Sequence, residues 1–328
     1  MPGGEADIRI LRASGDPSMR SDDEAATRLP FPVVTIGLAV YNGERYLREA
    51  LDSLVSQTLR NVEIVICDNA SEDATESICR EYAARDSRIR YYRNPTNIGG
   101  ARNENLTCQL ATGKYFHFAA HDDVCDPRLL EEGVRVLETR PEAVLMYPGI
   151  KRIDECGDLI EASIDSRGTE LTPSKRLRSL YRTTKGCEII YGVVRTDALR
   201  RSDLQLNYTD SDRSLLCQLA MFGEFVVVPE YLFSKRVHPE MSVLKFPDWR
   251  ARMAWFGDDV ASGPSLPNWQ QLRHLFSIVR RAPLTPAERF RCSIAMVGWV
   301  GIERRWRRLL KDLYVASKTL AQQRKNTP

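Results

Sequence analysis

The chain has 328 residues, and 43% of them are hydrophobic, which is enough apolar sequence to bury a substantial core. The net charge is only +3, so no global positive field favours nucleic-acid binding. Eight cysteines occur without a CxxC pair, and several lie in apolar runs, which predicts reduced core thiols and a cytoplasmic protein. Residues 1–32 lack the apolar core of a signal peptide, and no apolar run reaches about 18 residues, so we expect no transmembrane helix.

Residues 1–30 are rich in Gly, Asp, Ser and Arg without periodicity, and we expect a mostly disordered tail there. Apolar runs then predict buried strands at residues 33–40, 62–67 and 115–120, and further strands are expected at 88–92 and 143–147. Amphipathic patterns between these runs predict helices at residues 45–57, 73–84, 97–111 and 126–139. Because strand and helix alternate with short connections, residues 31–148 are predicted to form a doubly wound α/β unit around a mostly parallel sheet.

The pattern is looser after residue 149. We expect a hairpin over residues 149–160, helices at 173–181 and 210–222, and strands at 187–194, 225–228 and 231–237. Beyond residue 246 the chain becomes basic and carries several tryptophans, and prolines separate its helical patterns. Residues 246–328 are therefore predicted to form a basic helical C-terminal extension.

Two adjacent carboxylates, Asp122 and Asp123, follow the buried strand at residues 115–120 directly. The carboxyl edge of an open α/β sheet is where such folds bind ligands. A hard divalent metal that carries phosphate oxygens would relieve the repulsion between the two acids. The alternative is a solvated acidic turn, in which Asp126 caps the next helix and Pro127 occupies its first position. This stretch alone leaves both interpretations open.

Five motifs occur in a fixed order along the chain. They are VTIGLAVYNGERYL at 34–47, CDNASEDAT at 67–75, NIGGARN at 97–103, AAHDDV at 119–124 and YTDSDRSLLCQL at 208–219. Together they resemble the family 2 glycosyltransferases, which are inverting enzymes of the GT-A fold with nucleotide-sugar donors. The resemblance implies a Rossmann-like, mostly parallel sheet flanked by helices over residues 31–245. Residues 31–148 would be its nucleotide-binding half and residues 149–245 its acceptor half.

The resemblance also implies which residues bind the nucleotide sugar: Tyr41, Asn42, Glu44, Asp68, Arg102, Asp122 and Arg236. Asp68 can accept a hydrogen bond from a nucleobase imide, or it can simply form a turn. Tyr41 can stack on the base or close the core. Arg102 can bind base or phosphate, or pair with Asp68 and Asp73. Asp73 and Glu76 have the D-x-x-E spacing of a capping box, which predicts a structural role for Asp73.

For the metal, the resemblance implies that Asp123 ligates Mg²⁺ or Mn²⁺ and that Asp122 faces the ribose or a metal-bound water. His238, in the segment KRVHP, would complete the metal or diphosphate site beside Arg236, whereas the alternative is an exposed basic strand end. One departure weakens the match, because Ala120 stands where family members often carry a carboxylate. His121 is either a softer metal neighbour or an ordinary loop histidine.

The general base is expected in the fifth motif. Aligning Leu215 and Leu219 with the family's ED-x-x-L segment places the base on Asp212, with Asp210 as a cap or supporting partner. The expected function is inverting, metal-assisted transfer of a sugar from a UDP-, GDP- or dTDP-sugar to a glycan or lipid-linked acceptor, in polysaccharide or envelope glycan synthesis. One alternative is a nucleotidyltransferase, although YNGERYL does not look like the Gly-rich loop of that class. The other is an inactive sugar-nucleotide binding protein, suggested by Ala120.

Residues 289–313 combine an apolar run with a cluster of arginines at positions 304, 305, 307 and 308. Trp299 and Trp306 suit a membrane interface, and the arginines suit anionic head groups. A buried helix with a basic outer face explains the same residues. The membrane hypothesis predicts peripheral contact with the inner membrane face, near the acceptor.

Overall fold

The computed structural model describes residues 31–182, 186–208, 210–241, 266–301 and 305–326. The tail expected at residues 1–30 lies outside the described residues, and so do residues 246–265 of the expected extension. All eight cysteines are free thiols, and seven of them are buried, as expected for reduced core cysteines.

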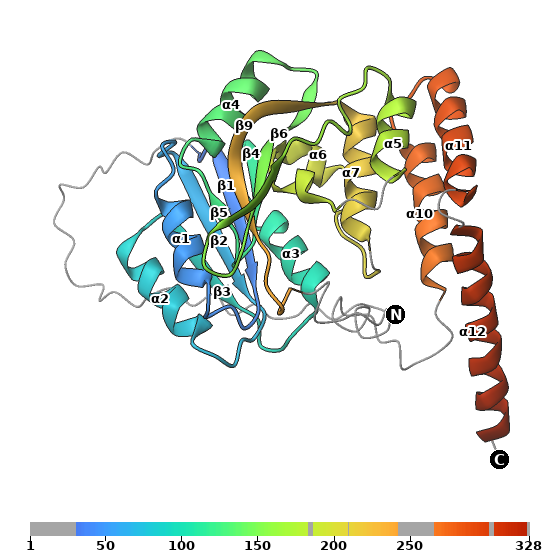
Figure 1. The fold of residues 1–328 in the computed structure, drawn as a ribbon, viewed down its shortest axis with the longest axis horizontal. Helices are drawn as coiled ribbons and strands as arrows, with labels where there is room; N and C mark the ends of the chain where they lie inside the picture. Colours follow the sequence, from blue (N-terminus) through green and yellow to red (C-terminus); the bar gives the residue numbers. More distant parts are fainter. Residues whose placement is uncertain (1–30, 183–185, 209, 242–265, 302–304, 327–328) are drawn as a thin grey trace.

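The first half of the chain forms the predicted parallel sheet with helices on both faces (Figure 1). Its strands lie in the order β3-β2-β1-β4, and all three neighbouring pairs are parallel. The strands are β1 (Val34–Val40), β2 (Val62–Asp68), β3 (Ile89–Arg93) and β4 (Tyr115–Ala119). The helices between and after them are α1 (Leu47–Val55), α2 (Thr75–Arg85), α3 (Gly100–Gln109) and α4 (Leu129–Thr139). Since parallel strands end at one edge, the loops after β1, β2 and β4 lie together.

The second half extends the same sheet with mixed pairing. β8 (Val193–Arg195) lies antiparallel between β4 and β6 (Ala143–Ile153). β9 (Glu224–Arg236) runs parallel to β6 and pairs with the short β5 (Val124–Cys125) at the sheet edge. β7 (Leu159–Ser163) returns antiparallel to β6, which confirms the predicted hairpin. The sheet is therefore continuous from the first half into the second.

Two strand predictions in this half were wrong. Residues 187–194 were predicted to be one strand, but they form a 3₁₀ helix, η1 (Glu188–Tyr191), followed by β8. A short apolar run does not distinguish the two conformations, because either can bury adjacent apolar side chains such as Ile189 and Ile190. The two strands predicted at 225–228 and 231–237 are one strand, β9. Its register against β6 shifts across Pro229, so the proline produces a bulge instead of ending the strand.

Further helices cover the second half. They are α5 (Pro173–Tyr181), α6 (Thr196–Arg200), α7 (Ser211–Phe222), α10 (Pro267–Arg281), α11 (Pro286–Gly301) and α12 (Arg305–Asn326). α10 and α11 pack against α7 and α5, and α12 continues along the edge of the molecule that is far from α1 and α2 (Figure 1). Among the described residues, no helix is long and apolar enough to cross a membrane.

Side chains pack into two hydrophobic clusters. One gathers α1, α2 and α4 against the sheet, and the other gathers α5, α7, α10 and α11. Trp299 belongs to the second cluster with 1% of its surface exposed, and the Arg305 guanidinium covers its ring at 4.7 Å. These two residues, which the membrane hypothesis counted among its anchors, therefore stabilise the core instead. Arg304 lies outside the described residues.

Candidate functional site

Two loops at the carboxyl edge of the sheet, residues 41–44 after β1 and residues 69–75 after β2, are fastened to each other. Backbone N–H groups of the first loop donate to side chains of the second: Asn42 to Ser71 Oγ at 3.0 Å, Gly43 to Thr75 Oγ1 at 2.8 Å and Glu44 to Asp73 Oδ2 at 3.1 Å. The Asn42 and Glu44 side chains accept in return from the N–H groups of Glu72 and Ala74, both at 2.8 Å. Asn42 and Glu44, expected to bind the donor, thus build the loop junction.

The structure also corrects the predicted capping box. α2 begins at Thr75, so Asp73 lies two residues before the helix and accepts from the N–H groups of Thr75 and Glu44. Glu76 forms an ion pair with Arg93 at 3.0 Å and does not reach back to Asp73 as a capping box requires. The role of Asp73 is structural, as expected, but it stabilises the loop junction and not the helix end.

Asp68, at the end of β2, is completely buried and fully hydrogen bonded. One carboxylate oxygen accepts from the Ser71 N–H at 2.9 Å, and the other accepts from the Tyr91 hydroxyl at 2.7 Å. The guanidinium of Arg93 lies 3.3 Å from the second oxygen. This network leaves Asp68 as a turn-organising acid in the present conformation. The next residue, Asn69, is the one whose side chain reaches the cavity.

Arg102 is exposed on α3 and lies away from Asp68. Its guanidinium contacts the side-chain amide of Asn207, which accepts from Nε and from the terminal nitrogen at 3.2 Å when the amide is oriented to satisfy both groups. The cation that neutralises Asp68 is therefore Arg93, and the structure does not bring Arg102 into the cavity.

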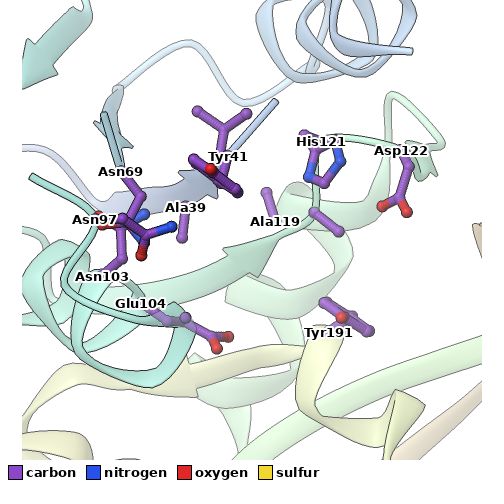
Figure 2. A pocket seen from close by; sticks show the side chains of 13 residues that line it. Ala39, Tyr41, Asn69, Asn97, Asn103, Glu104, Ala119, His121, Asp122 and Tyr191 are labelled. Atoms are coloured by element: carbon purple, nitrogen blue, oxygen red, sulfur yellow. The ribbon is translucent and has the colours of Figure 1, made fainter. Parts of the chain in front are cut away.

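A cavity of about 190 Å³ opens at this edge, and thirteen residues line it (Figure 2). Tyr41, the exposed residue that follows β1, borders it as expected. Three amide side chains gather at one end of the cavity, namely Asn69, Asn97 and Asn103. Asn69 and Asn97 are joined by a hydrogen bond of 2.8 Å. Asn69 and Asn103 are almost completely buried and are held by Asn94, so the exposed Asn97 is the amide that can donate to or accept from the edge of a polar ring without adding charge.

His121 and Asp122 lie at the other end of the cavity (Figure 2). The His121 ring lies over Gly43, where an added Cβ would come within 2.7 Å of the imidazole. Oδ2 of Asp122 lies 2.9 Å from Nε2 of His238. Burial alone would raise the pKa of Asp122, but the hydrogen bond from His238 and the charge of the nearby imidazoles outweigh it and hold that pKa below its usual value.

Asp123 points away from the cavity. It is 5% exposed, and its Oδ1 accepts from the backbone N–H of Arg236 on β9 at 2.8 Å. Burial and the neighbouring charge of Asp122 raise the pKa of Asp123 well above its ordinary value. The two adjacent acids therefore have different roles. Asp122 lines the cavity, and Asp123 fixes their loop to β9.

The Arg236 side chain is 1% exposed and does not line the cavity. Its guanidinium donates to the backbone oxygen of Asp122 at 3.0 Å, to two carbonyls of the β6–β7 turn, and to the Glu49 carboxylate at 2.5 Å. It also lies 4.7 Å from the centre of the Tyr46 ring. Arg236 therefore ties β9, the Asp122 loop and α1 together, whereas the resemblance had assigned it to the donor.

Asp210 and Asp212 lie at the start of α7. Asp210 adopts φ 72°, a left-handed conformation, and forms an ion pair with Arg213 at 3.1 Å. Asp212 accepts from the Arg213 N–H at 2.7 Å and from the Cys187 thiol. Burial and the neighbouring Asp210 raise the pKa of Asp212. In the part of the chain that the structure describes, Cys187, Asp210 and Asp212 form the one group of three that could ligate a metal, with ligand atoms within 4.8 Å.

Two residues that were not predicted from the sequence line the cavity and are influenced by the charge of Asp212. These are Glu104 of α3 and Tyr191 of η1 (Figure 2). Burial, followed by the charge of Asp212, raises the pKa of Glu104 to about 7. Burial and the charges of Asp123, Glu104, Asp122 and Asp212 raise the pKa of Tyr191 far above its usual value. Glu104 directly follows the NIGGARN motif, which was the available signal, whereas Tyr191 was hidden in a predicted strand.

Comparison with known proteins gives one family. Residues 35–204 match the family described as "Glycosyl transferase family 2". The putative glycosyltransferase EpsE of Bacillus subtilis (strain 168) is 34% identical over 188 residues, which are 54% of this chain and 66% of that protein. The uncharacterized glycosyltransferase RP339 of Rickettsia prowazekii (strain Madrid E) is 30% identical over 210 residues, 63% of this chain and 64% of that protein. The chain thus spans just under two thirds of the length of these relatives.

Solved structures share the fold. S. aureus TarS 1-349 superposes with a TM-score of 0.61 at 16% identity, covering 83% of this chain and 73% of that one. TarS 1-349 has also been solved in complex with UDP and with UDP-GlcNAc. The mannosyltransferase PcManGT from Pyrobaculum calidifontis, in complex with GDP-Man and Mn²⁺, gives a TM-score of 0.53 at 18% identity, covering 88% and 75% of the two chains.

Proposed function

The chain belongs to glycosyl transferase family 2, and we propose that it transfers a sugar from a nucleoside-diphosphate sugar to an acceptor hydroxyl with inversion. The observation that carries this proposal is the cavity, which has neutral amides at one end, the Asp122–His238 pair at the other and the acid Asp212 close enough to perturb Glu104. The complexes of TarS with UDP and of PcManGT with GDP-Man support the donor class.

The residues at the Asp122 end suit a divalent cation. Mg²⁺ and Mn²⁺ at such sites need one or two carboxylates, and the substrate phosphates supply further oxygens. Asp122 offers a cavity-facing carboxylate, and Nε2 of His238, 2.9 Å from its Oδ2, offers an imidazole nitrogen beside it. Asp122 and His238 would hold the metal, and Asp123 would fix the position of the loop that carries Asp122. When bound, the cation would neutralise the charge on the departing nucleotide.

The reaction also needs a base opposite the leaving group. Asp212 is fixed in the first turn of a helix by the Arg213 N–H, and its raised pKa makes it a better proton acceptor than an ordinary aspartate. We assign it to remove the proton from the acceptor hydroxyl. That oxygen then forms a bond to C1 of the sugar as the bond from C1 to the diphosphate breaks, so the anomeric centre inverts.

The donor would lie along the cavity. Its base and ribose would occupy the end bordered by Tyr41, Asn69 and Asn97, and its diphosphate would reach Asp122. The test is to titrate the purified chain with UDP-, GDP- and dTDP-sugars in the presence of Mn²⁺ and to follow transfer or hydrolysis. A protein that binds one of these donors but releases no nucleotide with any acceptor would be a binding protein. A protein that binds none would contradict the proposal.

We also place the acceptor at a membrane surface, as a lipid-linked or envelope glycan at the inner face. α11 exposes Phe290, Ile294 and Val297, and α12 exposes Trp306, Leu310, Leu313 and Tyr314, each at more than 40%. Exposed basic side chains flank these groups: Arg307 lies over the Trp306 ring at 5.3 Å, and Lys318 lies over the Tyr314 ring at 4.7 Å. Aromatic rings paired with basic groups suit the head-group region of an anionic membrane.

A second copy of the chain fits this face less well. Arg307, Arg308 and Lys311 are exposed on α12, and the one described acid of that helix segment, Asp312, is buried and hydrogen bonded to Asn268. Two such faces brought together would therefore repel each other, whereas anionic lipid would attract both.

A further inference from the structure

Glu104 is an acid inside the donor cavity with no role in the steps described so far. It lies on α3, one residue after Asn103, and its carboxylate points into the space between the amide end and Asp122 (Figure 2). Asp122 is the other acid that lines the cavity, and it is already paired with His238. Glu104 is therefore the carboxylate that remains for contact with the middle part of a bound donor.

The loop that precedes α7 holds Glu104 in place. Oε2 of Glu104 accepts from Nε2 of Gln205 at 2.6 Å. Gln205 is in turn fixed to α3 by two bonds with the side chain of Asn105, at 3.0 and 2.7 Å. Gln205 also accepts from the Ser211 hydroxyl at 3.4 Å, beside Asp212. Among the hydrogen bonds of the described residues, Oε1 of Glu104 has no partner, so it is available to a ligand.

Imidazoles partner Asp122, but no lysine or arginine among the described residues pairs with Glu104. The thirteen residues that line the cavity include no lysine or arginine. Lys235 forms an ion pair with Glu188 at 3.1 Å, and Arg236 forms one with Glu49. Burial, and then the negative charge of Asp212, raise the pKa of Glu104 to about 7. Asp212 therefore adds to the negative charge around Glu104. A further negative group beside Glu104 would meet the like charges of Glu104 and Asp212, and the charge of a cation at Asp122 would be neutralised by the diphosphate itself.

The donor sugar would lie in this part of the cavity. On the function proposed above, its C1 is joined to the diphosphate at Asp122 and is attacked from the side of Asp212. Glu104 lines the same cavity as Asp122, and its partner Gln205 accepts from Ser211, the residue before Asp212, so Glu104 is linked to both sides of the reaction. The sugar hydroxyls would donate to its free oxygen, as hydroxyl groups do to carboxylates.

We infer that Glu104 sets the donor class: this site takes nucleotide sugars whose sugar ring is uncharged, such as hexoses and N-acetylhexosamines, and rejects rings that carry a carboxylate. Glu104 is the specificity-determining residue, and the arrangement of Asn105, Gln205 and Ser211 keeps its carboxylate aimed at the ring.

Calorimetric binding to the full chain in the presence of Mn²⁺ tests this inference, at a pH of about 8, where a Glu104 carboxyl with a pKa of about 7 is mostly ionised. Two matched pairs differ only in oxidation at C6: UDP-glucose against UDP-glucuronate, and GDP-mannose against GDP-mannuronate. UDP and GDP alone report the nucleotide contacts. The variants are Glu104→Gln, which keeps the acceptor for Gln205 and removes the charge, and Glu142→Gln as a control, because Glu142 is an exposed glutamate outside the cavity.

The wild type should bind the neutral member of the recognised pair about tenfold more tightly or better. Glu104→Gln should narrow this ratio about fivefold or more by raising the affinity for the uronate donor, with the affinity for UDP or GDP unchanged. Glu142→Gln should leave the ratio as it is. Equal affinity for hexose and uronate, or a ratio that Glu104→Gln does not change, would overturn the inference alone. Failure of every nucleotide and nucleotide sugar to bind would contradict the proposed function, and the inference with it.

Discussion

Asp122 and His238 are 116 residues apart in the chain, and their side chains meet at 2.9 Å. β4 delivers the first to the edge of the cavity, and the end of β9 delivers the second. The contact closes the sheet edge at the point where the two halves of the domain join, so any ligand held by this pair touches both halves.

The first prediction separates the two adjacent acids. Asp122→Asn should weaken the Mn²⁺-dependent part of nucleotide binding about tenfold or more, because it removes the carboxylate that faces the cavity. Asp123→Asn should have a smaller effect, because asparagine can still accept from the Arg236 N–H. Titration of UDP or GDP with and without Mn²⁺ measures both. A larger loss of affinity from Asp123→Asn than from Asp122→Asn would indicate that Asp123 is the metal ligand.

The second prediction concerns the base. Asp212→Asn should lower the rate of transfer by on the order of 10²–10⁴-fold while donor affinity stays near that of the wild type. Asp210→Asn should be milder, because that carboxylate is half exposed and pairs with Arg213. Steady-state kinetics with the recognised donor distinguish the two. Small losses from both variants would rule out a general base at the start of α7.

The third prediction concerns Arg236. Arg236→Met should lower the free energy of unfolding by about 3 kcal/mol, because several buried hydrogen bonds are lost together. Arg102→Ala should leave it nearly unchanged, since that side chain is exposed. Urea unfolding midpoints provide the comparison. Were Arg236→Met as stable as the wild type but defective in nucleotide binding, the donor role inferred from resemblance would be restored.

The fourth prediction is a pH dependence of stability. His117 is completely buried, its Nδ1 lies 3.1 Å from the Gly192 carbonyl oxygen, and burial lowers its pKa from 6.5 to about 4. Between these values the unfolded chain binds the proton more tightly, so stability should be full above pH 6.5 and fall as the pH drops toward 4, by on the order of 3 kcal/mol. His117→Gln should lose that slope in urea unfolding at a series of pH values. An unchanged slope would assign it to other groups.

The fifth prediction tests the membrane face. The full chain should float with phosphatidylcholine vesicles that contain phosphatidylglycerol, and not with phosphatidylcholine alone. The double variant Val297→Ser with Leu310→Ser, and the double variant Arg307→Glu with Lys311→Glu, should each weaken binding about tenfold or more. Leu159→Ser with Ile160→Ser on β7 removes equally exposed apolar groups elsewhere and should have no effect. Binding that survives both α11–α12 variants would exclude this face.

Hydrophobic periodicity and turn residues predicted the fold of residues 31–148 well. β1, β2 and β4 are mostly apolar runs, and such runs leave little choice of conformation when helices alternate with them. The resemblance grouped Asp122 and His238 at one site, but their direct contact was not predicted. What the sequence could not show was side-chain direction: adjacent residues of a strand point to opposite faces, and β9 turns Arg236 into the core while Lys235 reaches Glu188.

Glu104 illustrates the other limit. The helix pattern places it on α3 beside the NIGGARN motif, but its importance depends on Gln205, which is 101 residues away and approaches only because its loop folds back on α3. Asp73 shows the converse limit, because its local pattern indicated a helix cap that the structure does not contain. Its local spacing fits a capping box, yet a contact with the distant Glu44 N–H fixes it elsewhere. Local patterns are reliable where no long-range partner competes for the same atoms.

Gly43 and His121 have a consequence for how this sequence can vary. A Cβ at position 43 would lie 2.7 Å from the His121 ring, so the two positions compete for the same volume. A relative with a bulkier residue at position 43 must carry a smaller one at position 121, or its loop must move outward. The two positions should therefore change together across the family, and His121→Ala should relieve only part of the clash from a Gly43→Ala exchange, because the added Cβ also meets Cγ2 of Val40 at 2.8 Å.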